Sequence, residues 1–403
     1  MKQINGGVCA AKGFTANGVH CGIRKNKTKR DLALIYSEAP ASAAAVYTTN
    51  LVKGAPLTVT KNNIANGVAQ AVICNSGNAN TCNANGIEIA TEMCKLLGDA
   101  LSIPADNVIV ASTGVIGQPL NIEPIAKGIP ALVDGLGDNS IYACEGIMTT
   151  DVKVKEIAFE VEIGGKICHI GGIAKGSGMI HPNMATMLVF VTTDCAISSE
   201  MLQAALSEDV KSSFNMISID GDTSTNDMVS VMANGLAGNE KITEAGADFD
   251  TFCEALHAVT SYLCRMIAAD GEGASKLLEC VVSGGKDDTN AKKVAKSVVC
   301  SSLFKAAMFG ADANWGRVLC AIGYSGADVD VTKVGVTFAS KAGEIKVCEG
   351  GAGVAFSEEK AKEILLCDEI QILIALGDGD AKATAWGCDL TYDYVKINGD
   401  YRT

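Results

Sequence analysis

The segment from Lys175 to Leu188, KGSGMIHPNMATML, contains the residues with the clearest chemical potential in this chain. A glycine-rich stretch and a proline lead to Thr186, and the apolar run Met187–Val191 follows directly. Because such a run predicts a buried strand, Thr186 stands where a flexible loop enters the core. A self-cleaving N-terminal nucleophile would sit at such a position. Cleavage before Thr186 would free its α-amine, whose pKa of about 7.7–8.0 suits it to act as general base for the threonine hydroxyl.

A simpler interpretation of this segment stays open. Glycine-rich loops often lead into apolar strands, and threonine is a favourable strand residue. On the pattern alone, Thr186 is therefore either a nucleophile or an ordinary residue at the start of a strand. His181 lies shortly before it and is either a group that tunes the nucleophile or a plain loop residue.

Three further segments carry candidate polar groups. ASTGVIG (Ala111–Gly117) follows a strand-like run, so its backbone N–H groups could form an oxyanion hole, although a tight turn also explains it. DGEGA (Asp270–Ala274) follows a helical segment and leaves Glu272 on a loop, facing either solvent or a substrate. DGDTSTND (Asp220–Asp227) is rich in carboxylates, but their spacing does not fit an EF-hand, and a turn or helix cap is expected.

A mixed scaffold must position these segments. Short apolar runs predict buried strands at Ala71–Cys74, Val108–Ala111, Met187–Val191 and Val229–Met232. Helical periodicity covers Gly86–Leu97, Met201–Glu208, Phe252–Ala268 and Glu359–Leu366. Two hairpins are expected, Ile157–Val161 with Cys168–Gly172 and Val334–Ala339 with Glu344–Cys348. Because strands and helices mix without a regular βαβ repeat, we expect an α+β fold of layered sheets flanked by helices.

Composition limits the classes of function. The 403 residues carry a net charge of −13, which disfavours nucleic acid or an anionic membrane as a partner, because both require clustered cations. No apolar stretch reaches the length of a membrane span, and the N-terminus lacks the hydrophobic core of a signal peptide. Sixteen cysteines are scattered without a CxxC or a Cys/His cluster, so we expect no metal site and a cytoplasmic location.

Taken together, the motifs resemble the ornithine acetyltransferase family of arginine biosynthesis, also named glutamate N-acetyltransferase. The resemblance extends over almost the whole chain, and the long central and terminal motifs are highly specific. The matching segments are GFTANGVHCGIR (Gly13–Arg24), ASTGVIGQPL (Ala111–Leu120), IMTTD (Ile147–Asp151), KGSGMIHPNMATML (Lys175–Leu188), DGDTSTNDM (Asp220–Met228), DGEGASK (Asp270–Lys276), GADANWGRV (Gly310–Val318) and AWGCDLTYDYVKINGDYRT (Ala385–Thr403).

The resemblance implies autocatalytic cleavage between Ala185 and Thr186 and a fold of the type found in N-terminal-nucleophile aminopeptidases. It implies an α chain, residues 1–185, which holds the oxyanion hole and part of the substrate pocket. The β chain, residues 186–403, would begin with the nucleophile, and its C-terminal tail would complete the pocket. Two copies of each chain would form an α₂β₂ heterotetramer.

The resemblance also implies a reaction. Thr186 would take an acetyl group from N2-acetylornithine, release ornithine, and pass the acetyl group to glutamate to form N-acetylglutamate in a ping-pong cycle. Thr113 and Gly114 match the oxyanion hole of the family. The substrate-binding positions are Thr149, Lys175, Thr186, Glu272, Asn398 and Thr403. Thr150 is an alternative to Thr149, since the two are adjacent and neighbouring residues on a strand face opposite ways.

No cofactor is implied, but acetyl-CoA is a second candidate acetyl donor, and no motif decides whether it is used. Two rival functions also fit parts of the pattern. An N-terminal-nucleophile amidase or aminopeptidase would pass the acyl group to water instead of glutamate. A non-catalytic amino-acid-binding protein would keep an intact chain of 41.6 kDa.

Overall fold

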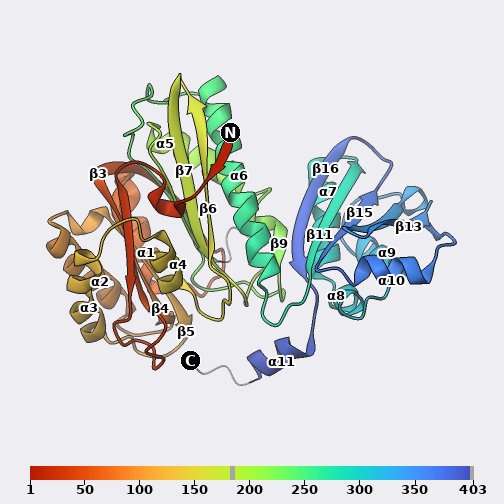
Figure 1. The fold of residues 1–403 in the computed structure, drawn as a ribbon, viewed down its shortest axis with the longest axis horizontal. Coiled ribbons are helices and arrows are strands. Elements are labelled where there is room, and N and C mark those ends of the chain that lie inside the picture. The colour runs from red at the N-terminus through yellow and green to blue at the C-terminus, as the bar shows by residue number, and fades with distance from the viewer. Residues whose placement is uncertain (182–186, 400–403) are drawn as a thin grey trace.

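The computed structural model describes residues 1–181 and 187–399, which form two lobes, each built on one sheet (Figure 1). The first lobe holds most of the chain up to the end of α6. The second lobe is built from segments that follow α6, and the short strand Ile217–Ser218 joins its sheet. Ala185, Thr186 and Thr403, which the sequence places in the site, lie outside the described residues.

In the described part of the chain, the first sheet has nine strands in the order β1-β6-β7-β8-β10-β3-β4-β5, with β2 paired to β3. The strands are β1 (Lys2–Ile4), β2 (Phe14–Val19), β3 (Leu32–Tyr47), β4 (Val68–Asn78), β5 (Val108–Val115), β6 (Lys155–Ile163), β7 (Lys166–Lys175), β8 (Leu188–Thr193) and β10 (Met228–Ala233). The helices are α1 (Ala55–Asn63), α2 (Gly86–Leu101), α3 (Ile122–Asp134), α4 (Ser140–Ile147), α5 (Ser199–Asp209) and α6 (Ala247–Ala269).

The alternation of side chains along the strands explains the layers of this lobe. Along Leu188–Val191 of β8, successive side chains join two different core clusters, and along Ala71–Cys74 of β4 they do so again. One cluster, which includes α4, is shared by both strands and is therefore internal. Helices α5 and α6 cover the outer face near β8, and α2 and α3 cover the outer face near β4. The α+β fold predicted from the sequence is confirmed.

Strand β3 connects the two halves of this sheet. Its first part pairs with β4 and its last part with β10, and a bulge interrupts its register with β4 between Tyr36 and Ala41. Because bulges bend and twist strands, this irregularity helps the sheet to curve round the internal cluster.

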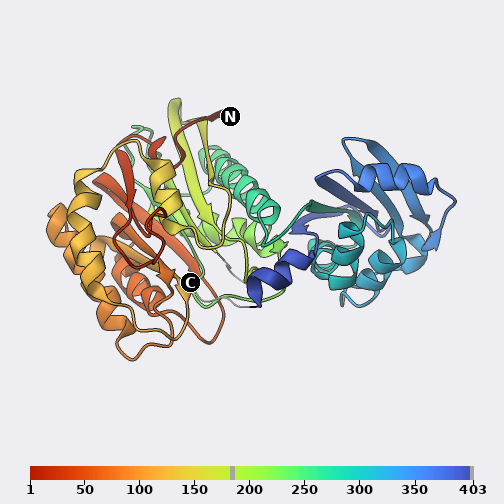
Figure 2. The same cartoon turned by 60° about the horizontal axis from the view of Figure 1, so that its bottom comes forward.

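The second lobe has a sheet whose described strands number seven, in the order β14-β13-β12-β15-β11-β16-β9. The strands are β9 (Ile217–Ser218), β11 (Leu277–Gly285), β12 (Gly335–Ser340), β13 (Gly343–Glu349), β14 (Ala352–Gly353), β15 (Glu369–Ala375) and β16 (Ala381–Cys388). The helices are α7 (Asp288–Cys300), α8 (Ser302–Phe309), α9 (Trp315–Gly323) and α10 (Glu358–Leu365). The last helix, α11 (Tyr392–Asn398), returns to lie between the lobes (Figure 2).

The predicted strands, helices and hairpins are all present, with ends that differ by a few residues. The first hairpin turns at Gly164 and Gly165, whose φ angles of 57° and 70° are readily available only to glycine. In the described ranges, no helix combines the length and the apolar character that a membrane span requires.

The expected cleavage position lies between two neighbouring strands of the first sheet. β7 ends at Lys175, which pairs with Leu188 at the start of β8. β8 and β10, which follow that position in sequence, lie between β7 and β3, which precede it. Residues 1–185 and 186–403 are therefore interleaved in one sheet rather than folded as separate units.

Candidate active site

The candidate site is a cavity at one rim of the first lobe. There the ends of β5 and β7 come together with the loop before β10 and the loop after α6. The cavity encloses about 590 Å³, its open mouth included. Its lining contains six of the residues that the sequence assigned to the site: Thr113, Gly114, Thr149, Lys175, Glu272 and Asn398.

Thr113 and Gly114, the expected oxyanion hole, lie near the end of β5 and line the cavity. Gly114 has a φ of 132°, and a Cβ atom built on it would lie 2.6 Å from the backbone nitrogen of Asn78. Only glycine permits this close approach of β5 to the end of β4. Thr113 is 8% exposed and lines the cavity, so its hydroxyl and the neighbouring N–H groups are candidate donors to a developing negative charge.

Asn226 holds this part of the site in place, a role that the sequence did not reveal. Its side-chain amide donates to the carbonyls of Ala79 at 2.6 Å and Ser112 at 3.0 Å. Its carbonyl oxygen accepts from the hydroxyls of Thr81 and Thr225, both at 2.6 Å. The segment Asp220–Asp227, predicted as a turn or helix cap, is therefore a hydrogen-bonded scaffold, and part of it also lines the cavity. Its density of hydroxyl and amide side chains was the available signal.

Lys175 supplies a cation at the end of β7. Its side chain is buried and lines the cavity. Within residues 1–181 and 187–399, no hydrogen bond or ion pair engages its ammonium group. A buried ammonium in the wall of a cavity is well suited to bind the carboxylate of a ligand.

Glu272 also lines the cavity and is only 7% exposed. The sequence left it open whether this acid faces solvent or a substrate, and the structure places it in the cavity. The amide of Asn398, at the end of α11, donates to Glu272 Oε2 at 2.6 Å. The N–H of Glu272 donates to the Ser177 carbonyl at 2.8 Å, which ties this part of the cavity lining to the loop after β7.

Thr149 and Thr150 both line the cavity. They lie in the loop between α4 and β6 rather than on a strand, so the argument that neighbouring residues face opposite ways was wrong here. The N–H of Thr149 donates to Asp151 Oδ2 at 2.9 Å. The assignment of Thr149 rather than Thr150 to the substrate remains a prediction.

His181 is anchored towards the second lobe. Its Nδ1 lies 3.0 Å from the Ser218 hydroxyl and 3.5 Å from the Cys300 thiol. Burial, together with the nearby Lys296 ammonium, lowers the pKa of His181 to about 4. His181 is not among the described residues that line the cavity.

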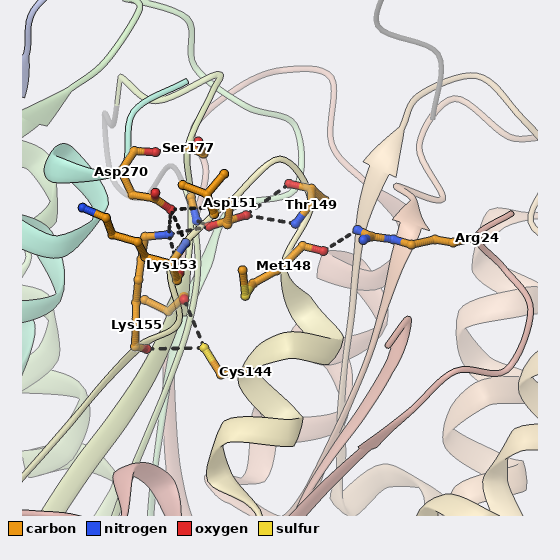
Figure 3. Close-up of polar contacts among 12 residues, drawn as sticks. Arg24, Cys144, Met148, Thr149, Asp151, Lys153, Lys155, Ser177 and Asp270 are labelled. Atoms are coloured by element: carbon orange, nitrogen blue, oxygen red, sulfur yellow. Dashed lines mark hydrogen bonds and ion pairs between the residues drawn. The ribbon is translucent and has the colours of Figure 1, made fainter. Parts of the chain in front are cut away.

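Three buried charged residues, Asp151, Lys155 and Asp270, contact one another, and two of them lie close in sequence to residues that line the cavity (Figure 3). The Lys155 ammonium lies 2.7 Å from Asp151 Oδ1 and 2.5 Å from Asp270 Oδ2. Burial alone would raise the pKa of Asp151, but Lys155 and Lys175 hold it well below its usual range. The two carboxylates likewise raise the pKa of Lys155 against the effect of its burial. The sequence analysis missed this group, although two of its members belong to the IMTTD and DGEGA motifs.

Comparison with known proteins decides the family. Residues 15–403 match the model of the ArgJ family. The chain belongs to the ArgJ family. It is 50% identical over 405 residues to the arginine biosynthesis bifunctional protein ArgJ of Caldanaerobacter subterraneus, with 100% of each chain covered. It is 48% identical over 406 residues to the protein of that name from Bacillus subtilis, covering 100% of this chain and 98% of the relative.

A solved member of the family supports the same conclusion. The crystal structure of the arginine biosynthesis bifunctional protein argJ from Bacillus halodurans aligns with a TM-score of 0.50 and 46% identity. It covers 53% of this chain and 97% of the solved chain. The resemblance drawn from the motifs is thus confirmed, and this ArgJ-family chain is an acyltransferase of arginine biosynthesis.

Proposed function

We propose that this ArgJ-family chain transfers an acetyl group from N2-acetylornithine to glutamate through an acetyl ester on Thr186. One observation carries the proposal: a single cavity brings together candidate oxyanion donors at Thr113 and Gly114, the cation Lys175 and the anion Glu272. Both amino acids carry an α-carboxylate, which Lys175 can bind, and ornithine carries an ammonium group that complements Glu272. Asn398 and Thr403 would close the pocket from the C-terminal segment.

Maturation would precede catalysis. The Thr186 hydroxyl attacks the Ala185 carbonyl carbon, the peptide C–N bond breaks as its nitrogen takes up the proton, and an ester remains. Water then hydrolyses this ester, which leaves a carboxylate on Ala185 and a free α-amine on Thr186. The solved relative supports cleavage, because 97% of that chain aligns with 53% of this one, and residues 186–403 are a similar share. The interleaved strands of the first sheet would keep the two pieces together.

In the transfer cycle, the Thr186 hydroxyl attacks the acetyl carbonyl of N2-acetylornithine and its proton passes to the free α-amine. Thr113 and Gly114 stabilise the tetrahedral oxyanion, and removal of one such donor in other enzymes costs about 10²–10³ in kcat. The α-ammonium returns the proton to the departing nitrogen of ornithine, and an acetyl ester remains on Thr186. The amine of glutamate then attacks the ester carbonyl carbon and loses a proton to the α-amine. That proton passes to the Thr186 oxygen as the ester C–O bond breaks, and N-acetylglutamate leaves.

Exchange of Thr186 tests the nucleophile. We expect Thr186→Ala to give one uncut chain without transferase activity, whereas Thr186→Ser, which keeps a hydroxyl, retains some cleavage and transfer. Gel electrophoresis and N-terminal sequencing measure cleavage, and the wild-type second fragment should begin TMLVF. Full activity of Thr186→Ala would refute the assignment, and an uncut but active wild type would refute the requirement for cleavage.

The acyl acceptor separates this proposal from the amidase alternative. With N2-acetylornithine and glutamate together, ornithine and N-acetylglutamate should appear in equal amounts. Release of acetate at a rate that does not depend on glutamate would favour an amidase that uses water. An intact chain that binds ornithine without turnover would favour a non-catalytic binding protein.

We further propose that acetyl-CoA is a second acetyl donor and that the cleaved enzyme is a cytoplasmic α₂β₂ heterotetramer. The curated relatives are named bifunctional proteins, which supports a second activity. An assay with glutamate and acetyl-CoA alone tests the donor, and no N-acetylglutamate above background would limit the enzyme to recycling acetyl groups. Light scattering of the cleaved protein tests the assembly.

A further inference from the structure

The inference starts from Lys155, at the first position of β6. Its side chain is fully buried, and its ammonium lies between the carboxylates of Asp151 and Asp270 (Figure 3). It also donates to the Lys153 carbonyl at 3.3 Å. Lys155 does not line the cavity in the part of the chain that is described, so it acts on the site only through its neighbours.

Asp151 connects Lys155 to two walls of the cavity. Its Oδ1 accepts the N–H of Gly176 at 2.7 Å, and Gly176 directly follows the cationic residue Lys175. Its Oδ2 accepts the N–H of Thr149 at 2.9 Å. One carboxylate therefore fixes the backbone at Thr149 and at Gly176, next to Lys175, and both Thr149 and Lys175 line the cavity.

Asp270 connects Lys155 to the part of the cavity lining that contains Glu272. Its Oδ2 accepts the N–H groups of Val152 at 3.1 Å and Lys153 at 3.3 Å. Its backbone carbonyl accepts the Ser177 hydroxyl at 2.6 Å. Glu272 lies two residues further on, and its N–H donates back to the Ser177 carbonyl at 2.8 Å. The backbone at Glu272 is thereby linked, through Ser177 and Asp270, to the buried ammonium of Lys155.

We propose that Lys155 is a positioning residue that holds three residues of the cavity lining, Thr149, Lys175 and Glu272, in one arrangement for substrate binding. The proposal rests on the proposed function, which makes this cavity the substrate pocket. Asp151 and Lys155 precede the proposed cleavage position, whereas Asp270 follows it. The ion pair between Lys155 and Asp270 therefore also joins the two fragments of the mature enzyme at the wall of the pocket. Because all three groups are buried, water cannot replace a missing partner at low cost.

The test compares Asp270→Asn, Lys155→Met and Lys155→Arg in the cleaved enzyme. Asp270→Asn keeps an acceptor oxygen but removes the charge that faces Lys155, and we expect it to fold. Calorimetry with ornithine measures binding without any transfer step, and steady-state assays separate KM from kcat. Because a misplacement of about 1 Å can cost on the order of 10²-fold, we expect ornithine affinity and kcat/KM to fall by about 10- to 10²-fold. Lys155→Arg, which keeps a cation, should recover part of this loss relative to Lys155→Met.

Lys276→Met is the matched control. Lys276 is also buried, but its ammonium donates to the Met308 carbonyl inside the second lobe. We expect this variant to lower the Tm and leave ornithine affinity unchanged. Wild-type affinity for ornithine in Asp270→Asn would overturn the proposal. So would a loss of affinity in Lys276→Met as large as that in Asp270→Asn when the two variants have the same Tm.

The cleaved proteins also report the link between the fragments. In size-exclusion chromatography across a urea series, the fragments of Asp270→Asn should separate at lower urea than those of the wild type and of Lys276→Met. Separation at the wild-type urea concentration would overturn the linking role. A wild type that binds ornithine but makes no N-acetylglutamate would defeat the proposed function instead, and the binding comparison would still test Lys155.

Discussion

Gly178→Ala should displace the Glu272 carboxylate in the cavity while leaving the fold intact. Gly178 has no left-handed φ, so its backbone tolerates alanine. The added Cβ would, however, lie 2.5 Å from Glu272 Oε1, whereas ordinary contacts begin at 3.4 Å. The carboxylate must therefore move by about 1 Å, and as the end of a flexible side chain it can do so at small cost in stability.

The consequence for function follows from the partners of Glu272. Its carboxylate accepts the Asn398 amide at 2.6 Å and, under the proposed function, binds the ammonium of ornithine. Hydrogen bonds to charged groups contribute about 1.5–3 kcal/mol. Loss of one such interaction corresponds to about 10- to 10²-fold in kcat/KM for N2-acetylornithine. Thermal unfolding should change little.

Gly246→Ala is the matched control, because nothing lies within 4 Å of the position that its Cβ would take. Steady-state assays and thermal unfolding of both variants give the comparison. A double variant with Glu272→Gln sharpens it: if both changes act through one carboxylate, the double variant should be hardly worse than Glu272→Gln alone. Wild-type kcat/KM in Gly178→Ala, or full additivity in the double variant, would refute the reasoning.

Two further predictions concern the loop before the expected cleavage position. Asp220→Asn should slow self-cleavage by about tenfold, because the Asp220 carboxylate accepts the N–H groups of Met179 at 2.6 Å and Ile180 at 2.8 Å. A time course on denaturing gels measures the rate of cleavage. An unchanged rate would exclude a role of Asp220 in holding the loop. The pKa of His181, lowered to about 4, means that the unfolded chain takes up its proton first as the pH falls. The contribution of His181 to stability should therefore be constant above about pH 7 and decrease below about pH 6.5, by at most about 2 kcal/mol at pH 5. Urea unfolding should show this loss in the wild type but not in His181→Gln, and equal slopes would contradict it.

Local sequence was sufficient for the elements of the fold. The unbroken apolar runs Ala71–Cys74 and Leu188–Val191 reflect strands with a core on both faces, and the structure confirms both. The motifs also named residues that line the cavity, such as Lys175 and Glu272, because each lies within a segment that can be recognised from the amino-acid sequence alone.

Sequence did not show how these segments meet. Glu272 stands in a glycine-rich loop that is equally compatible with solvent, and only its packing against Gly178 and Asn398 makes it a buried acid. The ion pair between Lys155 and Asp270 joins residues far apart in the chain, and no periodicity records such a contact.

The sequence by itself therefore determined the types of the elements, the family and the identity of most candidate groups, because these depend on local pattern and composition. The tertiary structure decided which groups share one cavity, which charges are buried together and how the segments on either side of residues 185 and 186 interleave. The physical reason is that burial and charge pairing depend on the spatial arrangement of distant segments, whereas propensity and alternation depend on neighbours along the chain.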